Sequence, residues 1–509
     1  MSKARRTAVI DLGSNTFRLV VFSAGKGWWR RSDEIYEPVR IGEHVSADGK
    51  LGKAQMARAL DAIDVFAHFC RATKIPDDCI RAVATSAIRD ATNQQKFVAA
   101  AHERSGLEID VLSREEEARY GYLAAVNSTT LRDGAVLDLG GGSMQLVRVR
   151  DRHADKLASW PLGAVRMTER FLESDAPAKK GDLDALRDHV ARELQDGGAW
   201  LPKAGDRIVG IGGTVRNLAA ATSAAAGLPS MGVQGFPIAA AALDELVERL
   251  ASLPPSERGG VRGIKPGRAD VILAGAVVIQ TVLREGGFDE LEVTEAGLRE
   301  GVFFSEHLAD RDPPLFDDVR RESVLNLAAQ YQVDPAHTAH VAALALGIFD
   351  SLAADGVFTG DPVERRLLWA ACMLHDIGMR VDYDDHHKHS RYLILNGGLP
   401  GYSPIEVALI AQAARYHRKG MSELGPYAKL AGPGDDRRLD RLSVLLRLGE
   451  DLERSRDQSV TAAKVTTGDD GTVTLTLEAD EGVEVARWAA QRETELFERA
   501  FDRKLRVEA

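Results

Sequence analysis

The sequence predicts two α/β halves, then an all-helical region, then a small α+β tail. A motif near the start, VIDLGSNTFRLV at 9–20, returns in altered form as VLDLGGGSMQLV at 136–147. Runs typical of strands and helices alternate after each copy, and beyond the paired prolines near 310–320 the pattern is helical to about residue 462. With 509 residues, the chain exceeds the roughly 250–300 residues at which one hydrophobic core stops growing, so several domains are expected.

Each copy of the motif predicts a β-hairpin, because a β-rich run ends in Asp, turns through Gly and small residues, and resumes as a strand. Strands and helices then alternate in both halves, which implies two α/β domains facing each other across a cleft. We place these halves at 1–126 and 127–312. The elements expected after the first copy are a helix at 52–73, a strand at 80–90, a second helix, a strand at 107–113 and a helix at 115–126. Those expected after the second are a strand at 156–165, a helix at 185–201, a strand at 206–214 followed by a helix, and a strand at 291–295 leading into a helix.

The rest of the chain is assigned to an all-α domain at 316–462 and a small α+β domain at 463–509, with two strands around the turn DDG and an amphipathic helix. The longest apolar run, at 271–283, falls short of the roughly 20 residues that a membrane span needs. We therefore expect a buried core helix there and no membrane association.

The composition limits the possible binding partners and the cellular location of the protein. A formal net charge of −11 argues against broad nucleic-acid binding, which depends on a basic surface. The basic segment at 257–268, which contains Arg262 and Arg268, is the best candidate for holding a polyanion, although charge alone favours a solvated loop. Three scattered cysteines and the lack of an export-like apolar run predict a cytoplasmic location.

The two Asp-Gly turns suit phosphate binding, because glycines let backbone N–H groups approach phosphate oxygens and the Asp can hold a divalent cation. A tight hairpin with a surface carboxylate is the alternative for one such turn, but two copies and a third Gly-rich element at 208–218 favour a phosphate site. The candidates are Asp11 and Asp138 for the cation, and Gly13, Ser14, Asn15, Thr16, Gly140, Gly141, Gly142, Ser143, Gly212, Gly213 and Thr214 for the phosphate.

These three elements resemble the phosphate and adenosine motifs of the actin, sugar-kinase and Hsp70 superfamily, with its ribonuclease H-like fold. More specifically, the chain resembles the exopolyphosphatase and guanosine pentaphosphate phosphohydrolase (Ppx/GppA) family. The segments that carry the resemblance are ATSAIRDATN at 84–93, SREEEARYGY at 113–122, DLGGGSMQL at 138–146, RADVILAGAVVI at 268–279 and GLREGVFF at 297–304. It implies a Mg²⁺-dependent, homodimeric hydrolase of inorganic polyphosphate or guanosine pentaphosphate, with a link to the stringent response.

The same resemblance implies roles for two further residues. Glu117 stands where the family has the general base that activates the attacking water, and Arg89 stands where it has a phosphate clamp. The alternative for Glu115, Glu116 and Glu117 is a solvated helix start that stabilises the helix dipole. We prefer that alternative for Glu115 and Glu116, and catalysis for Glu117.

One position departs from the family pattern. Gln145 stands where the family usually has Glu, a second candidate for metal binding or for positioning water. Glutamine can still orient a water molecule, but it carries no negative charge and cannot accept a proton. The catalytic role therefore falls more heavily on Glu117.

The helical region contains a second set of candidates, which resembles the HD phosphohydrolase superfamily. Imidazole and carboxylate together suit Mn²⁺, Fe²⁺, Mg²⁺ or Zn²⁺, so an HD-like domain with a second divalent metal is implied. We expect His386 and His387 to be exposed loop residues. The implied ligands are His340, His375, Asp376, His389, His417 and Asp451.

Four functions follow from these observations. The leading hypothesis is an exopolyphosphatase in which Glu117 activates water. The second is an actin-like kinase or ATPase, which needs an adenine pocket and an acceptor site. The third is a noncatalytic or weakly catalytic regulator that binds alarmone or polyphosphate, which Gln145 favours. The fourth assigns a phosphohydrolase activity to the HD-like domain.

Overall fold

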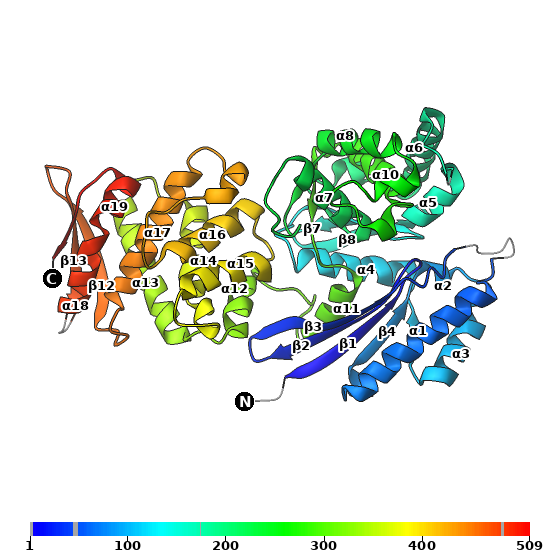
Figure 1. Cartoon of the computed structure of the whole chain (residues 1–509), viewed down its shortest axis with the longest axis horizontal. Helices are drawn as coiled ribbons and strands as arrows, with labels where there is room; N and C mark the ends of the chain where they lie inside the picture. The colour runs from blue at the N-terminus through cyan, green and yellow to red at the C-terminus, as the bar shows by residue number, and fades with distance from the viewer. Residues whose placement is uncertain (1–3, 44–48, 174, 480–482, 509) are drawn as a thin grey trace. The chain divides into compact units, whose positions relative to one another are not determined.

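The chain forms two compact units, Met1–Val319 and Arg320–Ala509. This computed structural model describes residues 4–43, 49–173, 175–479 and 483–508. The first unit contains two mixed sheets with their helices, and the second contains helices and one small sheet (Figure 1). The break between the units falls just after the paired prolines, as the sequence predicts.

The two sheets of the first unit repeat one topology. The first has the order β3-β2-β1-β4-β5, in which β4 and β5 run parallel to β1. The second repeats it as β8-β7-β6-β9-β11, and β10 adds an antiparallel edge strand. The predicted duplication is thus confirmed in the fold. The strands are β1 (Arg5–Leu12), β2 (Phe17–Gly25), β3 (Trp28–Glu37), β4 (Ile80–Ala84), β5 (Ile109–Val111), β6 (Gly134–Leu139), β7 (Met144–Arg150), β8 (His153–Trp160), β9 (Ile208–Ile211), β10 (Pro237–Ala239) and β11 (Glu290–Val293).

Both predicted hairpins are present, and their turns have the same internal hydrogen bond. The Gly13 N–H donates to the Thr16 carbonyl at 3.2 Å, and the Gly140 N–H donates to the Ser143 carbonyl at 3.0 Å. In the register of β1 with β2, Asp11 lies opposite Arg18, and in that of β6 with β7, Asp138 lies opposite Gln145. Each central strand therefore has an aspartate at its next-to-last position, just before the turn.

The helices of the first unit cover these sheets. The long apolar segment at 271–283 is a buried core helix, α10, as predicted. The helices are α1 (Lys53–Ala72), α2 (Ser86–Arg89), α3 (Gln94–Ser105), α4 (Arg114–Val126), α5 (Ala164–Phe171), α6 (Lys180–Gln195), α7 (Gly213–Ala225), α8 (Ala240–Ala251), α9 (Pro255–Arg258), α10 (Ile272–Gly286) and α11 (Leu298–His307), with short 3₁₀ helices at η1 (Asp77–Cys79), η2 (Leu201–Lys203) and η3 (Pro266–Arg268).

Helix α11 departs from the predicted limits of the second half. It packs on α4 and returns to β1 of the first sheet (Figure 1). The Phe303 ring stacks on Phe22 with 4.3 Å between centroids, and Phe304 meets Trp29 edge-on at 5.1 Å. The last helix of the second half thus completes the core of the first, which ties the two halves together.

The second unit is built around helices, and its small sheet belongs to it. The hairpin predicted in the tail is confirmed as β12 and β13, and a third strand, β14, runs parallel to β13. Strand β12 packs on α13, where the Val465 N–H donates to Ser351 Oγ at 2.9 Å. Residues 463–509 are therefore not a separate unit. The elements are α12 (Val319–Gln330), α13 (Pro335–Ala354), α14 (Pro362–Leu374), η4 (Ile377–Arg380), α15 (His386–Gly397), α16 (Pro404–Tyr416), η5 (Gly425–Leu430), α17 (Asp435–Leu452), β12 (Val460–Thr467), β13 (Val473–Ala479), α18 (Glu484–Ala490), η6 (Gln491–Glu493), α19 (Thr494–Phe501) and β14 (Leu505–Glu508).

One helix of this unit, α13, is long and apolar enough to cross a membrane by length and composition alone. In the structure it packs against α14, α17 and β12, and half of its apolar window is buried there. Its apolar character is therefore used in the core of the second unit.

Candidate active site in the first unit

Both Asp-Gly turns open into one cleft of about 810 Å³ in the first unit. Most of the phosphate-site residues predicted from the sequence line it. These are Asp11, Gly13, Ser14, Asn15, Thr16, Glu117, Asp138, Gly140, Gly141, Ser143, Gly212, Gly213 and Arg268. The sequence reasoning missed several others, namely Arg18, Thr85, Ser86, Arg216 and Arg299.

Close packing of the two turns brings the halves of the cleft together. Ser14 Oγ and Ser86 Oγ share a hydrogen bond of 3.0 Å. A Cβ atom on Gly142 would lie 2.5 Å from Ser86 Oγ and 3.1 Å from Ser14 Oγ. A side chain at position 142 would therefore displace the Ser86 hydroxyl, and Gly142 itself does not line the cleft.

Glu117 is set apart from its acidic neighbours by burial. Helix α4 begins with a capping box in which Ser113 and Glu116 satisfy each other's backbone N–H groups, and Glu115 and Glu116 are exposed. Glu117, one residue further on, is 8% exposed and reaches the cleft. The solvated helix start proposed for Glu115 and Glu116 is thus what the structure has, while Glu117 faces the site.

Two side chains hold the Glu117 carboxylate. Arg89 Nη1 lies 2.6 Å from Oε2, and Ser143 Oγ donates to Oε1 at 3.4 Å. Burial raises the pKa of Glu117, Arg89 opposes that rise, and the negative charge of Asp11 adds to it. A raised pKa moves a carboxylate toward the range in which a general base works best near neutral pH.

Asp11 and Asp138 are also buried near other charged groups of the cleft. Burial raises the pKa of Asp138 to about 7, and the charges of Glu117 and Asp11 add to that rise. Burial also raises the pKa of Asp11, although Arg299, whose Nη1 is 3.4 Å from Asp11 Oδ2, opposes it. Three mutually repelling carboxylates in one cleft favour a bound cation, because it would offset their charge.

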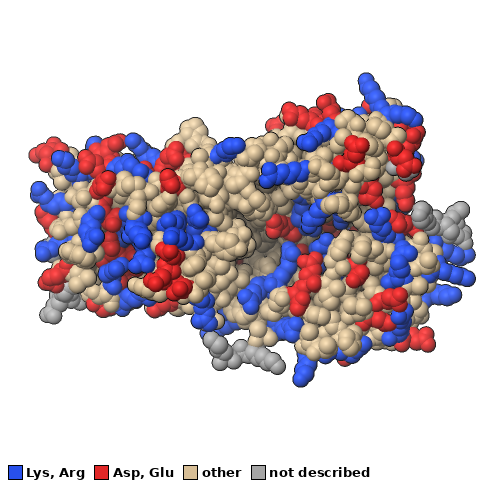
Figure 2. All heavy atoms as spheres, viewed as in Figure 1, with Lys and Arg blue, Asp and Glu red and all other residues tan. Residues whose placement is uncertain are grey.

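Four arginines bring positive charge to the same cleft: Arg18, Arg216, Arg268 and Arg299. Burial lowers the pKa of Arg216 to about 10, with a further contribution from the charge of Arg299. Nε of Arg299 is buried and has no hydrogen-bond partner among the described residues. The cleft thus gathers four arginines in a chain of net charge −11, whereas Figure 2 shows basic and acidic side chains interspersed over the face that it draws. Such crowding of guanidinium groups favours a polyanionic ligand.

Helix α7 adds backbone donors to the cleft. Its first turn follows Gly212, which has a φ of 110° that only glycine adopts readily, and Gly212, Gly213 and Arg216 line the cleft. The first N–H groups of a helix have no partner within the helix and carry a partial positive charge. An anion bound there would be stabilised by both effects.

Several predicted phosphate contacts lie elsewhere. The Arg89 guanidinium is held against Glu117 and the Leu112 carbonyl, so it supports the carboxylate and does not line the cleft. Gln145 is 1% exposed and donates to Ser143 Oγ at 2.9 Å, so it reaches Glu117 only through that serine. Arg262 is exposed outside the lining, and Thr214 is buried behind it. None of these four residues lines the cleft in this structure, and their contacts with phosphate stay predictions.

Comparison with known proteins decides the family. The sequence matches the Ppx/GppA phosphatase family over residues 31–310, and domain III of the same family over residues 319–496. The chain belongs to the Ppx/GppA phosphatase family. It is therefore an enzyme of the phosphoanhydride hydrolase class, of the exopolyphosphatase type.

Solved structures agree with this membership. A Ppx/GppA family member from Aquifex aeolicus is 29% identical with a TM-score of 0.52, and the match covers 60% of this chain and 99% of that one. An exopolyphosphatase-like protein is 27% identical with a TM-score of 0.53, covering 59% and 97%. An exopolyphosphatase from Cytophaga hutchinsonii, at 22% identity, 59% and 97% coverage and a TM-score of 0.54, shows the actin-like fold alone.

In domain III of this Ppx/GppA protein, the structure gathers a different set of histidines from the one that the sequence suggested. His375, Asp376 and His417 lie in the cluster, together with His337, His386 and Glu450. His340, His389 and Asp451 are not in it. His386 and His387 are buried in the first turn of α15 rather than exposed in a loop. Asp451 follows Glu450 directly on α17, so its side chain points to a different side of the helix. His340 and His389 lie three positions after His337 and His386, on nearly the same helix face, and His340 instead hydrogen-bonds to the Val460 carbonyl at 2.9 Å.

Proposed function

We propose that the cleft hydrolyses the terminal phosphoanhydride bond of inorganic polyphosphate, with guanosine pentaphosphate as a second substrate and Glu117 as the general base. One observation carries this proposal. A buried carboxylate of raised pKa lies in the same cleft as four arginines and two Gly-rich turns. Such a cleft suits a chain of phosphates whose last phosphorus is presented to a water molecule beside Glu117.

In the proposed reaction, a water oxygen attacks the terminal phosphorus while the Glu117 carboxylate accepts one of its protons. The P–O bond to the next phosphate breaks, the electron pair stays on the bridging oxygen, and orthophosphate leaves. Arg18, Arg216, Arg268 and Arg299 line the same cleft and would offset the charge on the phosphoryl oxygens. Arg89 would keep the Glu117 carboxylate oriented and, until the reaction, unprotonated.

The lining favours polyphosphate over ATP. None of the described residues that line the cleft is aromatic, and the only larger apolar side chains there are Leu139, Ile211 and Leu298. An adenine ring is usually held in an apolar slot with a few placed polar groups. A cleft lined mainly by glycine, hydroxyl and charged groups suits phosphate groups instead, which supports hydrolysis over the kinase or ATPase hypothesis.

We also propose that Mg²⁺ assists this site, where it would neutralise charge on the phosphate oxygens. Asp11 and Asp138 would hold it, because burial and neighbouring negative charge raise the pKa of both carboxyls and a cation would offset that charge. Among the described residues, the groups of three candidate ligands within 4.8 Å of one another lie in the second unit, not here. The aspartates thus fit an ion that keeps several of its waters, as Mg²⁺ commonly does.

The test is orthophosphate release by the purified protein from long-chain polyphosphate, guanosine pentaphosphate and ATP, each with and without Mg²⁺. We expect release from polyphosphate in the presence of Mg²⁺, lost in Glu117→Gln. Undiminished turnover by Glu117→Gln would reject the assigned base. Formation of ADP from ATP without any cleavage of polyphosphate would instead support the kinase or ATPase hypothesis.

A further inference from the structure

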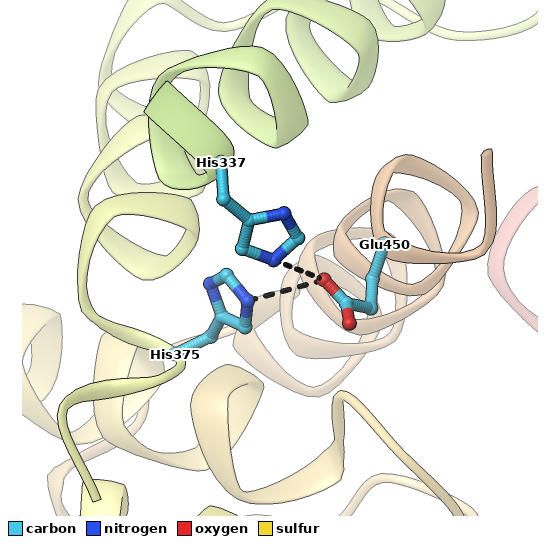
Figure 3. Close-up of side chains that lie close together, drawn as sticks. All are labelled: His337, His375 and Glu450. Carbon is cyan, nitrogen blue, oxygen red and sulfur yellow. Dashed lines mark ion pairs between the residues drawn. The ribbon is translucent and has the colours of Figure 1, made fainter. Parts of the chain in front are cut away.

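Three helices of the second unit direct side chains toward one point in its interior. His337 comes from α13, His375 from the residue after α14, and Glu450 from α17 (Figure 3). His337 Nε2 lies 3.1 Å and His375 Nε2 3.3 Å from Glu450 Oε2. Both imidazoles are almost fully buried, at 3% and 0% exposed. This first trio therefore points two ring nitrogens and a carboxylate oxygen at one small space.

A second trio adjoins the first through the neighbour of His375. Asp376 Oδ1 lies 3.3 Å from His386 Nε2, which lies 3.1 Å from His417 Nε2. The same aspartate reaches back to the first trio, since its Oδ1 is 3.6 Å from His375 Nε2 and its Oδ2 is 3.9 Å from His337 Nε2. Asp376 is thus within reach of both groups.

The spacing of these atoms matches the edges of a coordination polyhedron. With ligands about 2.1 Å from a metal ion, neighbouring ligand atoms lie about 3.0 Å apart around an octahedral ion and about 3.4 Å apart around a tetrahedral one. The four shortest separations in the two trios run from 3.1 to 3.3 Å. The ligand atoms of each trio all lie within 4.8 Å of one another.

The protonation of the rings argues for a cation as well. In three of the four histidines, Nδ1 is hydrogen-bonded to a backbone carbonyl: His375 to Cys372 at 2.6 Å, His386 to Tyr383 at 2.9 Å and His417 to Ala414 at 2.7 Å. A carbonyl oxygen only accepts, so Nδ1 carries the proton and, in the neutral ring, Nε2 presents a lone pair. These lone pairs then face each other or a carboxylate oxygen at close range, an arrangement that a metal ion between them would stabilise.

The same atoms lack well-formed hydrogen bonds. Nε2 of His375, both ring nitrogens of His337 and Oε2 of Glu450 are buried and make no hydrogen bond among the described residues, and the two rings contact the carboxylate only at ion-pair distances. Native proteins provide hydrogen bonds for nearly all buried polar atoms. A bound metal ion would coordinate these atoms together.

We propose that the second unit binds two first-row divalent transition-metal ions, one held by His337, His375 and Glu450 and the other by Asp376, His386 and His417, with Asp376 placed to bridge them. Mixed imidazole and carboxylate ligands suit Mn²⁺, Fe²⁺, Co²⁺ or Zn²⁺ better than Mg²⁺. With Asp376 as a bridge, the first ion would have four protein ligands and the second three, which leaves positions open around a six-coordinate ion. This centre is separate from the phosphate cleft of the first unit.

Arg456 lies at the edge of the proposed centre, where it brings a positive charge and is partly open to solvent. Arg456 Nη2 donates to Asp376 Oδ2 at 2.9 Å, and the Arg456 side chain is 46% exposed. The carboxylate that would bridge the ions is therefore reached from the surface side of the unit. An oxyanion bound at the open metal positions would meet the Arg456 guanidinium.

The test is metal analysis of the full-length protein, freed of any purification tag, stripped with a chelator and reloaded separately with Mn²⁺, Co²⁺ or Zn²⁺ before desalting. We expect two ions per chain, and Co²⁺ absorption bands typical of nitrogen and oxygen ligands. His337→Gln and His386→Gln should each lose one ion. Matched controls come from the same helices: His340→Gln and His389→Gln should keep both.

Circular dichroism and gel filtration would show whether each variant folds, and Asp138→Asn, which removes a proposed metal ligand of the cleft, should retain both ions and so show that they are not in the cleft. A parent protein that retains no ion after reloading would overturn the proposal. So would a folded His337→Gln or His386→Gln protein that binds as much metal as its control. Retention of a single ion by the parent would reject the second trio or the first, according to which variant loses it.

Discussion

The cleft of the first unit and the histidine cluster of the second both contain buried carboxylates. In the cleft their neighbours are other carboxylates and arginines, and in the cluster their neighbours are mainly histidines. In the cleft, Asp138 has a pKa raised to about 7, because burial and its acidic neighbours outweigh the nearby arginines. In the cluster, burial acts to raise the pKa of Asp376, but His375, His386 and His417 outweigh it and hold that pKa well below its ordinary value. Burial alone thus does not determine the direction in which the pKa of a carboxyl group shifts; the charges of its neighbours decide it.

The partners also differ in what they can bind. Arginine cannot ligate a metal and donates in a fixed fork that matches phosphate, so the cleft is suited to a polyanion. Imidazole offers a lone pair, so the cluster is suited to a cation before any substrate arrives. Two sites in one chain therefore have separable chemistry, and substitutions in one should leave the other intact.

The largest effect is expected on the rate of hydrolysis when the proposed base of the cleft is replaced. Glu117→Gln should lower the rate of polyphosphate hydrolysis by about 10³-fold, in the range that general bases contribute, with little change in KM. The measurement is steady-state orthophosphate release. Glu115→Gln, an exposed residue two positions earlier on α4, is the matched control and should retain nearly the parent rate. A similar loss in both variants would show that the effect comes from the helix and not from the base.

The next effect tests which basic residue of the 257–268 segment serves the cleft. Arg268 lines it and packs against Gly213, whereas Arg262 is exposed outside it. Arg268→Ala should raise KM for polyphosphate by about 10–100-fold, the range expected for losing a charge-assisted hydrogen bond. Arg262→Ala should leave KM unchanged. Equal KM values in the two variants would remove Arg268 from the binding site.

The raised pKa of Asp138 predicts how the stability of the protein changes with pH. Because its pKa is raised from an ordinary 3.8 to about 7, the folded state binds more protons than the unfolded state between those values. Stability should therefore fall as pH rises through this window. Asp138→Asn removes that loss. Its free energy of unfolding, measured by urea denaturation, should exceed that of the parent by up to about 4 kcal/mol at pH 8 and by little at pH 4. The exposed Asp206→Asn, the control, should show no such pH dependence.

Much of the first unit was predictable from sequence because its signal is local. Alternating apolar residues on each side of an Asp-Gly turn define both hairpins, and the apolar run at 271–283 defines α10. Where the strand at 80–90 was expected, however, β4 ends at Ala84 and α2 begins at Ser86. The edge strand β3 carries little apolar pattern, and β14 alternates apolar and polar residues over only four positions, so pairing with a neighbour decides both strands.

The sites were less predictable because their members meet from distant parts of the chain. Asp11 and Arg299 are 288 residues apart, and only the return of α11 to the first sheet joins them. Arg216 stands in a motif whose glycines were noticed, but its direction depends on where α7 begins. In the second unit, His337 and His340 are equally plausible ligands in sequence. His340 instead hydrogen-bonds to the Val460 carbonyl at 2.9 Å, which only the packing of β12 reveals.

The smallest expected effect concerns the position at which this chain departs from its family. Gln145 donates to Ser143 Oγ, and Ser143 in turn donates to Glu117 Oε1. In Gln145→Glu, the new carboxylate would accept the Ser143 hydroxyl proton instead, so Glu117 would lose a donor and gain a nearby like charge. Both changes raise the pKa of Glu117 further.

The acid limb of the pH dependence of kcat/KM should then move to higher pH, while the rate at its optimum changes by less than about tenfold. Gln145→Leu is the matched control, because it removes the hydrogen bond without adding charge and should move the limb less. An identical shift in both variants would mean that the hydrogen bond alone tunes Glu117. No shift in either would mean that Ser143 does not transmit the effect, and that Glu117 is set by Arg89 and burial.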